Sequence, residues 1–570
     1  MSNLSGLTKR RYWPLLLAGW IATLVLGHWG FTIYFREQGE IKTFVDIAYL
    51  DLQLYKLSGG SVSGHVPWQL NIARIAAPSI AAIAIFRAMF LFLGDRVRES
   101  RVRRLRNHII VCGAGEAGVH IAASARDAGL KAVVIDRESG TASLDKWKAQ
   151  GGFYIAGDMS EPETLRAAAV QRARALVAVS GDDGKNANIA LSARRALEKT
   201  KRETPLVCHV QLIDYDLSSL FRSSPLFRDT SGVTEMRVMN AYDTAARVAS
   251  SAHPLDRETI GADDPRVPQL ILLGFGRMGA SLALQYAKIA HYANGRPLEI
   301  AVFDRAASMR EKAFLARHPG LKNICALRFH ECAFDDASAI EEVCSLACRP
   351  NALSTVAICL DGDSQSLAFG LAVQTALRGT RVPILVRMSS KNGLAALLGD
   401  APPGGQLVPF GMLEQVCDWT ALDSEPLDRL AKEVHRLYQL KREAEGAAET
   451  AVLPPWRELD PTLQDSCRQQ ADHLPIKLRT LRCVVENGAG APIEFRADEI
   501  EILARMEHRR WVAERFLAGW RPGPKDNANK ITPYLVDYDL LDDTIKDYDR
   551  DTVRNLPRLI EMAGGHIRRV

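Results

Sequence analysis

Residues 106–136 read RNHIIVCGAGEAGVHIAASARDAGLKAVVID, and this stretch decides the fold. Its pattern predicts a buried strand, a glycine-rich turn, an alanine-rich helix and a second strand that ends at Asp136. Gly113, Gly115 and Gly118 have the G-x-G-x-x-G spacing, which gives a tight turn, a close approach of backbone to a pyrophosphate, and close packing of helix on strand. Asp136 is placed to accept hydrogen bonds from ribose hydroxyls. We therefore predict a dinucleotide-type fold, in which the turn either binds a nucleotide or is purely architectural.

The composition sets the scale of the protein and argues against two kinds of site. At 570 residues the chain is long enough for three or four domains. It has 72 Lys and Arg against 67 Asp and Glu, a balance that does not favour nucleic acid as a partner. Its 10 cysteines form no C-x-x-C pair, and Cys344 and Cys348 lack the further Cys or His that a zinc site needs. We predict no metal site, and a reducing compartment for most of the chain.

Two apolar runs near the N-terminus predict membrane spans. Residues 12–35 contain no charged residue and, as a helix, cover about 36 Å, enough to cross the hydrocarbon core of a bilayer. Residues 75–93 form a second run that only Arg87 interrupts. Basic residues cluster before the first run and after the second, so both termini are predicted to face the cytoplasm. A cleaved signal peptide is the alternative for the first run, but no small-residue cleavage site follows it.

The segment between the two runs has the layout of a pore loop. Residues 44–57 are amphipathic enough for a short helix, and the Gly/Ser segment SGGSVSG follows at residues 58–64. A helix, a glycine-rich loop and a second span together suit a loop whose irregular backbone lines a water-filled path. An ordinary extracytoplasmic loop is the alternative.

The glycine turn occurs a second time, in PQLILLGFGRMGASLALQYAKIA, and the strand EIAVFD that follows again ends in an acid. Further motifs recur in the same order, including P-L-D-R at residues 254–257 and 426–429. Strands that alternate with helices predict a parallel sheet in each copy, with ligands at the carboxyl ends of the strands. The residues of the second copy that match the first turn and its acid are Gly274, Gly276, Gly279 and Asp304.

The two apolar runs, an arginine-rich connector, GAGEAG with Asp136, Gly157–Asp158 and VSGDDGKNANIALSARRA together resemble the RCK (TrkA-N-like) domains that regulate potassium channels and transporters. The resemblance covers residues 107–420 in two copies. It implies that NAD(H), ATP or ADP binds at the glycine turn and that a ring of such domains, a homotetramer, pulls on pore helices in a lipid bilayer. By resemblance, the nucleotide contacts of the first copy are Gly113, Gly115, Gly118, Asp136, Asp158 and Ser180.

Two features of the resemblance leave alternatives open. The second turn is either an occupied nucleotide site or a degenerate one used only for assembly. The segment SGGSVSG also departs from the T-x-G-Y-G-like filter of potassium channels, so the resemblance does not extend to potassium selectivity.

The C-terminal blocks EHRRWVAERFLAGW, KITPYLVDYDLL and KDYDRDTVRNLPRLI resemble the ryanodine receptor (RyR) repeat domain in its bacterial form, over residues 455–570. That resemblance implies a sensor of a small nucleotide, of the kind that accompanies antiviral systems. Tryptophan rings can stack on a base, and Arg and Lys can hold phosphate. The alternative is that both tryptophans belong to the core and that Glu507 and Arg510 form a surface ion pair. The candidate ligand contacts are Arg468, His508, Trp511, Trp520 and Lys530.

These observations predict a two-span α-helical membrane domain, two α/β Rossmann-like domains and a small, mainly α C-terminal domain. The preferred function is a ligand-gated, RCK-regulated ion channel of the inner membrane that passes potassium or cations in general. The alternative is a membrane-anchored nucleotide sensor without a pore. An NAD-dependent enzyme is disfavoured, because no paired acid and base and no nucleophile motif accompany the turns, so we predict no catalytic residue. The predicted domains are residues 1–106, 107–253, 254–430 and 431–570.

Overall fold

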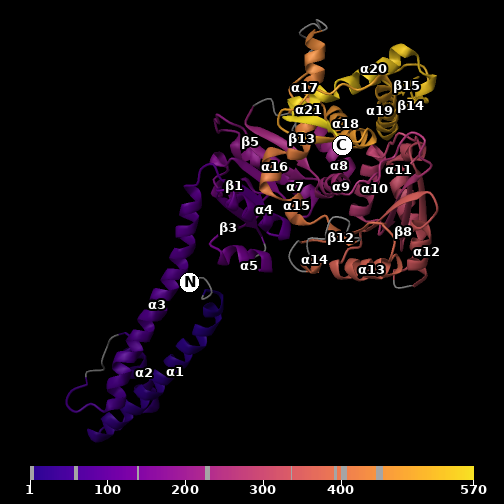
Figure 1. Ribbon diagram of the computed structural model, residues 1–570. Coiled ribbons are helices and arrows are strands. Elements are labelled where there is room, and N and C mark those ends of the chain that lie inside the picture. The colour runs from indigo at the N-terminus through magenta and orange to yellow at the C-terminus, as the bar shows by residue number, and fades with distance from the viewer. Residues whose placement is uncertain are drawn as a thin grey trace.

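The computed structural model describes residues 5–56, 62–137, 140–224, 232–334, 337–390, 394–398, 407–444 and 453–570. It contains a helical hairpin, two parallel sheets with helices packed around them, and a mainly helical C-terminal part (Figure 1). The predicted fold class is confirmed.

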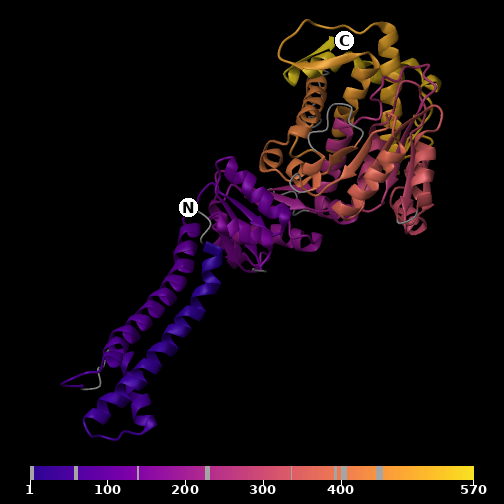
Figure 2. The ribbon, with the colours of Figure 1, turned by 60° about the horizontal axis from the view of Figure 1, so that its bottom comes forward.

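The hairpin projects from the rest of the molecule as a long arm (Figures 1 and 2). Its two long helices each contain a stretch apolar enough to span a membrane, Leu16–Glu37 and Trp68–Met89, and only 22% and 11% of those stretches is buried. Their exposure shows that they are not core helices of a globular body, because such helices are mostly buried. The hairpin consists of α1 (Ser5–Glu37), α2 (Phe44–Leu54) and α3 (Trp68–Arg103).

Helix α3 extends beyond the predicted second run at both ends. It begins at Trp68, because Leu70, Ala73 and Ala77 are buried against the first helix although Arg74 interrupts the apolar pattern. It ends at Arg103 without a break, so the arginine-rich connector is helical almost to its end. The arm and the first sheet are therefore joined by continuous helix.

The first sheet is parallel throughout, with strand order β3-β2-β1-β4-β5-β6. Strands β1 and β4 are buried over their whole length, as expected for a sheet covered on both faces. The strands are β1 (Ile109–Cys112), β2 (Ala132–Asp136), β3 (Phe153–Ala156), β4 (Ala175–Ala178), β5 (Leu206–Gln211) and β6 (Thr234–Met239). The helices are α4 (Glu116–Asp127), α5 (Ala142–Ala149), α6 (Pro162–Ala167), η1 (Val170–Arg172), α7 (Asp183–Leu197), α8 (Tyr215–Ser223) and α9 (Ala241–Ala252).

The second sheet repeats this topology, with order β12-β11-β10-β7-β8-β9, so the predicted internal repeat is present in the fold. Its strands are β7 (Val267–Leu273), β8 (Glu299–Asp304), β9 (Ala326–Glu331), β10 (Ala352–Ile358), β11 (Ile384–Arg387) and β12 (Leu407–Phe410). Its helices are α10 (Arg277–Ile289), α11 (Ala307–Arg317), η2 (Pro319–Asn323), α12 (Ala337–Ala347), α13 (Asp363–Ala376), α14 (Leu394–Leu397), α15 (Leu413–Val416), α16 (Trp419–Ser424) and η3 (Pro426–Asp428).

The C-terminal part shares its core with both sheets, because one hydrophobic cluster contains Ile109, Leu272, Leu474 and Met506. Strands β13 and β16 pair antiparallel within it. Its elements are α17 (Arg429–Ala444), α18 (Pro461–Thr480), β13 (Cys483–Asn487), α19 (Ala497–Leu517), β14 (Arg521–Pro522), β15 (Ile531–Thr532), η5 (Tyr538–Leu540), α20 (Asp543–Arg554), α21 (Leu556–Met562) and β16 (Gly565–Arg569).

The repeated tetrapeptide P-L-D-R supplies the two acids that hold the C-terminal part. Asp256 accepts two hydrogen bonds from Arg479, at 2.8 Å each, and Asp428 Oδ2 accepts two from Arg468, at 2.9 and 2.7 Å. Both arginines belong to α18, and both acids are buried. Helix α18 therefore contacts the same position of each copy and ties the two copies together.

Arg247 of α9 completes the cluster around Asp428. Its guanidinium lies 2.8 Å from Asp428 Oδ1 and 2.9 Å from Asp472 Oδ2. Burial alone raises the pKa of Asp428, but Arg468 and Arg247 outweigh it and hold that pKa below its ordinary value. The carboxylate is therefore charged at neutral pH and bound to arginines on both sides.

We predict that Arg247→Met lowers the stability of the folded chain by about 3 kcal/mol, because two largely buried carboxylates lose their shared cation. The change is measured as a fall in the midpoint of thermal unfolding in detergent. Arg457→Met is the matched control, since Arg457 is 66% exposed and also joins the C-terminal part to the first sheet, through Glu235 at 2.9 Å. That exposed pair should contribute less than about 1 kcal/mol. Equal shifts for the two variants would contradict the prediction.

Candidate functional site

The first glycine turn has two glycines that the fold requires and one that it does not. A Cβ on Gly113, whose φ is +124°, would lie 2.5 Å from Val179 O, and a Cβ on Gly118 would lie 2.0 Å from Gly113 O. Both positions exclude a larger residue on packing grounds. A Cβ on Gly115 would meet no atom within 4 Å of the described structure. The space beside Gly115 is therefore available to a ligand that approaches the backbone.

Asp136 closes the turn from the neighbouring strand. Its Oδ2 accepts a hydrogen bond from the Ala114 N–H at 2.6 Å, which fixes the middle of the turn against the end of β2. The backbone carbonyl of Asp136 accepts from Tyr154 Oη at 3.0 Å. The acid thus lies beside the glycines, where the sequence predicted it, and it also stabilises the turn, which the sequence did not reveal.

Asp158 lies at the end of the next strand, β3, and pairs with Arg137. Its Oδ1 accepts from the Ser160 N–H at 2.9 Å. These hydrogen bonds, that from Ser160 first and that from Arg137 after it, lower the pKa of Asp158 below its ordinary value. The sequence interpretation missed Arg137, although a basic residue directly after the strand-ending acid was visible in the sequence. With its exposed guanidinium, Arg137 is the cation at this edge that can reach a phosphate.

Ser180 lies at the end of β4 in a loop that Asn186 holds. Asn186 Oδ1 accepts from both the backbone N–H and the hydroxyl of Ser180, at 2.8 Å each, and Asn186 is fully buried. Asp182 caps the following helix by accepting from the Lys185 N–H at 2.7 Å. Four neighbouring strands, β3, β2, β1 and β4, therefore bring their predicted site residues to one edge of the sheet.

The second turn has the same backbone architecture, but its acid, Asp304, is more buried than Asp136 of the first turn. Asp304 Oδ2 accepts from the Phe275 N–H at 2.7 Å, as Asp136 does in the first copy, and Oδ1 accepts from the Ala306 N–H at 2.9 Å. Asp304 is only 9% exposed. A Cβ on Gly279 would lie 2.4 Å from Gly274 O, whereas one on Gly276 would meet nothing nearer than 3.9 Å. Both oxygens of this acid are thus already used by the protein.

In the C-terminal part, the structure brings Trp511, Trp520 and Lys530 to the end of α19. The guanidinium of Arg515 lies between the two indoles, 5.3 Å from the ring of Trp511 and 5.0 Å from that of Trp520. Lys530 Nζ donates to Ala518 O at 3.0 Å. Both tryptophans are half-buried, so neither is a fully enclosed core residue. Arg515 was missed, although it follows Trp511 by one helical turn.

The other two candidates in this part are held by the protein itself. His508 is buried, with its ring nitrogens 2.9 Å from Val536 O and 3.2 Å from Asp549 Oδ2. Arg468 lies away from that group, bound to Asp428 and 5.5 Å from the ring of Trp456. A role for either residue in ligand binding stays a prediction.

The ion pair of Glu507 and Arg510 exists, but its description as a surface pair is wrong. Arg510 Nη2 lies 2.9 Å from Glu507 Oε1, and Lys477 Nζ lies 2.5 Å from Glu507 Oε2. All three side chains are buried. Helix α18 packs over this face of α19 and supplies the lysine, which the sequence of α19 alone does not show.

The predicted pore loop is described only in part. Its helix is confirmed as α2, which ends at Leu54, and Asp51 of α2 lies 3.0 Å from His28 of α1. Most of the segment SGGSVSG, residues 58–61, lies outside the described residues. Within the described part of the chain, no group of three or more His, Cys, Asp or Glu side chains could hold a metal ion.

We predict that Gly115→Ala and Gly118→Ala separate ligand binding from folding. A methyl group at Gly118 meets Gly113 O and should lower the unfolding midpoint, whereas one at Gly115 meets no protein atom and fills the space for a ligand. Calorimetric titration with NAD and ADP, beside thermal unfolding, measures both properties. The Gly115 variant should keep the wild-type midpoint and lose affinity at least tenfold, about 1.4 kcal/mol. Unchanged affinity would show that no ligand approaches this turn.

Family models match the first sheet and the C-terminal end of the chain. Residues 109–213 match the family model described as TrkA-N domain, and residues 496–569 match the model described as RyR domain. Over 100 residues the chain is 30% identical to "Potassium channel protein 1" of Methanocaldococcus jannaschii, covering 18% of this chain and 30% of that protein. It is 26% identical over 110 residues to an uncharacterized protein of Methanothermus fervidus, covering 19% and 17%. The chain thus matches less than a third of the length of these curated relatives.

Similar solved structures include two of the GsuK channel. The structure titled "GsuK channel bound to NAD" has a TM-score of 0.39 and 15% identity, and the match covers 73% of this chain and 83% of that one. The structure titled "Crystal structure of the GsuK bound to ADP" has a TM-score of 0.39 and 16% identity, with 72% and 96% covered. From the family models, the chain carries a TrkA-N (RCK) domain in its first sheet and an RyR domain at its C-terminal end.

Proposed function

We propose that this protein is a channel-type membrane protein in which a nucleotide, bound at the first glycine turn, controls the passage of ions. The observation that carries the proposal is the joint between membrane helix and sheet. Helix α3 runs unbroken from the apolar stretch Trp68–Met89 to Arg103. The next residues lead directly into β1, which ends in the glycine turn. A movement of the turn is therefore transmitted to the membrane helix with little slack.

The joint is fixed by apolar burial and by hydrogen bonds. Val102 and Leu105 are 0% and 5% exposed and belong to the same hydrophobic cluster as Ile110 of β1. Burial of each such side chain contributes about 1.5–3 kcal/mol. Arg172 donates to the Arg103 carbonyl, and the Asn107 N–H donates to Arg172 O at 2.9 Å. The end of α3 is thus part of the first sheet's core.

A nucleotide suits the first turn because its phosphates and its ribose each have a partner at that edge. The backbone beside Gly115 is open to a pyrophosphate, at the N-terminus of α4. Asp136 lies where ribose hydroxyls bind, and Arg137 offers a cation. The match to the TrkA-N model over residues 109–213 supports this assignment. NAD(H), ATP and ADP all contain the groups that these residues suit.

The C-terminal part is proposed as a second sensor. The half-buried tryptophans Trp511 and Trp520 flank Arg515, and together they offer ring faces and a cation to a base and a phosphate. Because α18 is bound to both copies of the repeat, a ligand here can bias the two sheets as well. A role in antiviral defence remains a proposal from the RyR resemblance.

The proposed topology places both termini in the cytoplasm of a cell with the hairpin in its inner membrane. The start of α1 and the end of α3 lie at the same end of the arm, beside the first sheet (Figure 2). The basic residues at this end suit the cytoplasmic surface. The proposed domains are residues 1–106, 107–253, 254–430 and 431–570.

A homotetramer supplies enough free energy to open a pore from modest ligand binding. A ligand shifts a conformational equilibrium only by its difference in affinity for the two states. If each of four chains contributes about 1.4 kcal/mol, the sum of about 5.6 kcal/mol is close to the 5.5 kcal/mol that converts 1:99 into 99:1. The number four comes from the RCK resemblance.

A membrane-anchored sensor without a pore is the second candidate. The observation that favours it is the segment SGGSVSG, which differs from the filter of potassium channels. Ion flux separates the two candidates directly, because both require the nucleotide and only one requires conduction.

We predict that vesicles reconstituted with the protein show cation flux that depends on NAD or ADP. Asp136→Asn should abolish the dependence, because an amide oxygen can still accept from the Ala114 N–H but the side chain loses the charge that a ribose hydroxyl pairs with. Asp304→Asn is the matched control in the second copy, and it should leave the response intact. Its unfolding midpoint is measured as well, because the amide nitrogen cannot accept from the second of the two backbone N–H groups that Asp304 binds. Nucleotide binding without flux in any condition would favour the sensor without a pore.

We also predict that a flexible insertion of four Gly and Ser residues after Ser100 uncouples binding from conduction. It separates the membrane helix from Val102 and Leu105, which stay anchored in the sheet. The flux ratio with and without nucleotide should fall to about one while affinity is unchanged. The same insertion after Lys201, in an exposed loop, is the control. A normal response from the Ser100 insertion would refute mechanical coupling.

A further inference from the structure

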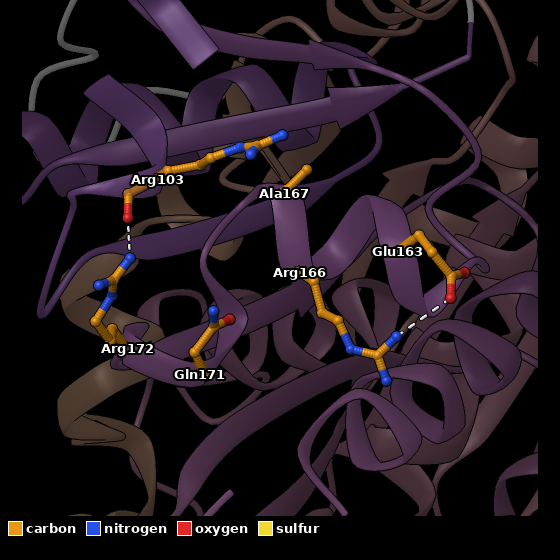
Figure 3. A pocket seen from close by; sticks show the side chains of 6 residues that line it. All are labelled: Arg103, Glu163, Arg166, Ala167, Gln171 and Arg172. Atoms are coloured by element: carbon orange, nitrogen blue, oxygen red, sulfur yellow. Dashed lines mark hydrogen bonds and ion pairs between the residues drawn. The ribbon is translucent and has the colours of Figure 1, made fainter. Parts of the chain in front are cut away.

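A cavity lies at the edge of the first sheet opposite the glycine turn. It is next to the starts of β1 and β4, where the Asn107 N–H donates to Arg172 O and the Arg174 N–H donates to His108 O. Its volume is about 380 Å³, which is within the range of small-molecule sites. Figure 3 shows the residues that line it, from the end of α3, from α6 and from η1: Arg103, Glu163, Arg166, Ala167, Gln171 and Arg172.

The lining is strongly basic, with three guanidinium groups against one carboxylate. Arg166 Nη1 lies 3.2 Å from Glu163 Oε1, but the two side chains are 49% and 80% exposed. Such an exposed pair contributes less than about 1 kcal/mol, so an anion can readily displace the glutamate. Arg172 donates to the Arg103 carbonyl, which orients its guanidinium (Figure 3).

Two buried polar atoms of the lining lack hydrogen-bond partners in the described part of the chain: Arg172 Nε, a donor, and Gln171 Oε1, an acceptor. Buried polar groups are nearly always hydrogen-bonded, and one left unpaired is unfavourable. Both atoms are covered in this structure, so a ligand that presents an anionic oxygen and an O–H or N–H group satisfies them when the two side chains turn toward the cavity. A phosphate ester has these two features.

We propose that this cavity binds a soluble, phosphate-bearing small molecule, at a site separate from both glycine turns. The ligand bridges α3, through Arg103, to the first sheet's own elements, through Arg166 and Arg172. Its occupancy therefore tightens the joint between α3 and the sheet. If the proposed function holds, occupancy of this site controls how strongly nucleotide binding at the glycine turn is coupled to movement of α3.

The position of the cavity favours a soluble ligand over a lipid headgroup. The apolar sequence continues to Leu93, so Arg103 follows its end by ten helical residues, or about 15 Å. The headgroup region adds only about 5–7 Å to each side of the hydrocarbon core. The cavity thus lies about 8–10 Å outside the headgroup layer, which favours a soluble phosphate over one fixed in the bilayer.

Calorimetric titration of the full-length protein in detergent, with inorganic pyrophosphate and with ADP as probes, tests the proposal. At least one probe should bind wild type, and Arg166→Gln and Gln171→Leu should each weaken that binding about tenfold, the effect of one lost charge-assisted or buried hydrogen bond. Arg195→Gln on α7 is the matched control for the loss of one exposed charge and should have no effect. Arg172→Gln also removes the hydrogen bond from Arg172 to the Arg103 carbonyl of α3. The unfolding midpoint of this variant is therefore measured beside its affinity.

Gly115→Ala distinguishes this site from the glycine turn and keeps the test independent of the proposed function. Binding of the probe that Arg166→Gln weakens should survive Gly115→Ala, and it should do so whether or not vesicles show ion flux. Loss of that binding in the Gly115 variant would place the phosphate at the turn and overturn the proposal. Equal weakening by Arg195→Gln, or no binding of either probe, would overturn it too. Binding only to vesicles that contain phosphatidylinositol bisphosphate would assign the site to lipid and contradict a soluble ligand.

Discussion

The burial of Val102 and Leu105 in the core of the first sheet is the constraint on which the proposed function depends. These two side chains make the end of α3, the helix that contains the apolar stretch Trp68–Met89, part of the core of the first sheet. Without them α3 would end in a flexible, arginine-rich linker. A movement at the glycine turn would then not be transmitted to the helix. With them, every force on β1 acts on a continuous helix that reaches the apolar stretch. The arginine-lined cavity lies at the same joint, so both of the proposed ligands would act on one connection.

A second constraint fixes the two sheets and the C-terminal part relative to one another. Helix α18 binds the P-L-D-R acid of each copy, Asp256 and Asp428, so the two sheets and the C-terminal part share one core and one set of buried ion pairs. Desolvation offsets much of the attraction within buried ion pairs, so they add little net stability. Their main effect here is to fix the positions of the elements that they join. Through these pairs, the proposed ligand of the C-terminal part would act on both sheets together.

The sequence predicted what local pattern determines and missed what distant contacts determine. The glycine spacing, the strand-ending acid and the internal repeat follow from short-range rules, and the structure has them all. The pairing of Arg137 with Asp158 depends on β3 lying beside β2, and Arg479 reaches an acid 223 residues earlier. Glu507 looked exposed because the sequence of α19 does not show that α18 covers it. The arginine-lined cavity is formed by three separate elements, so no local pattern in the sequence predicts it.

Amide hydrogen exchange through the end of α3 tests the central claim most directly. If the helix is continuous and anchored, the amides of residues 102–105 exchange as slowly as those of β1, because opening them requires opening the core of the sheet. Nucleotide binding should then slow exchange at the glycine turn and change it at these residues together. Fast exchange at residues 102–105, like that of an exposed loop, would contradict a rigid joint and with it control of the membrane helix by the turn.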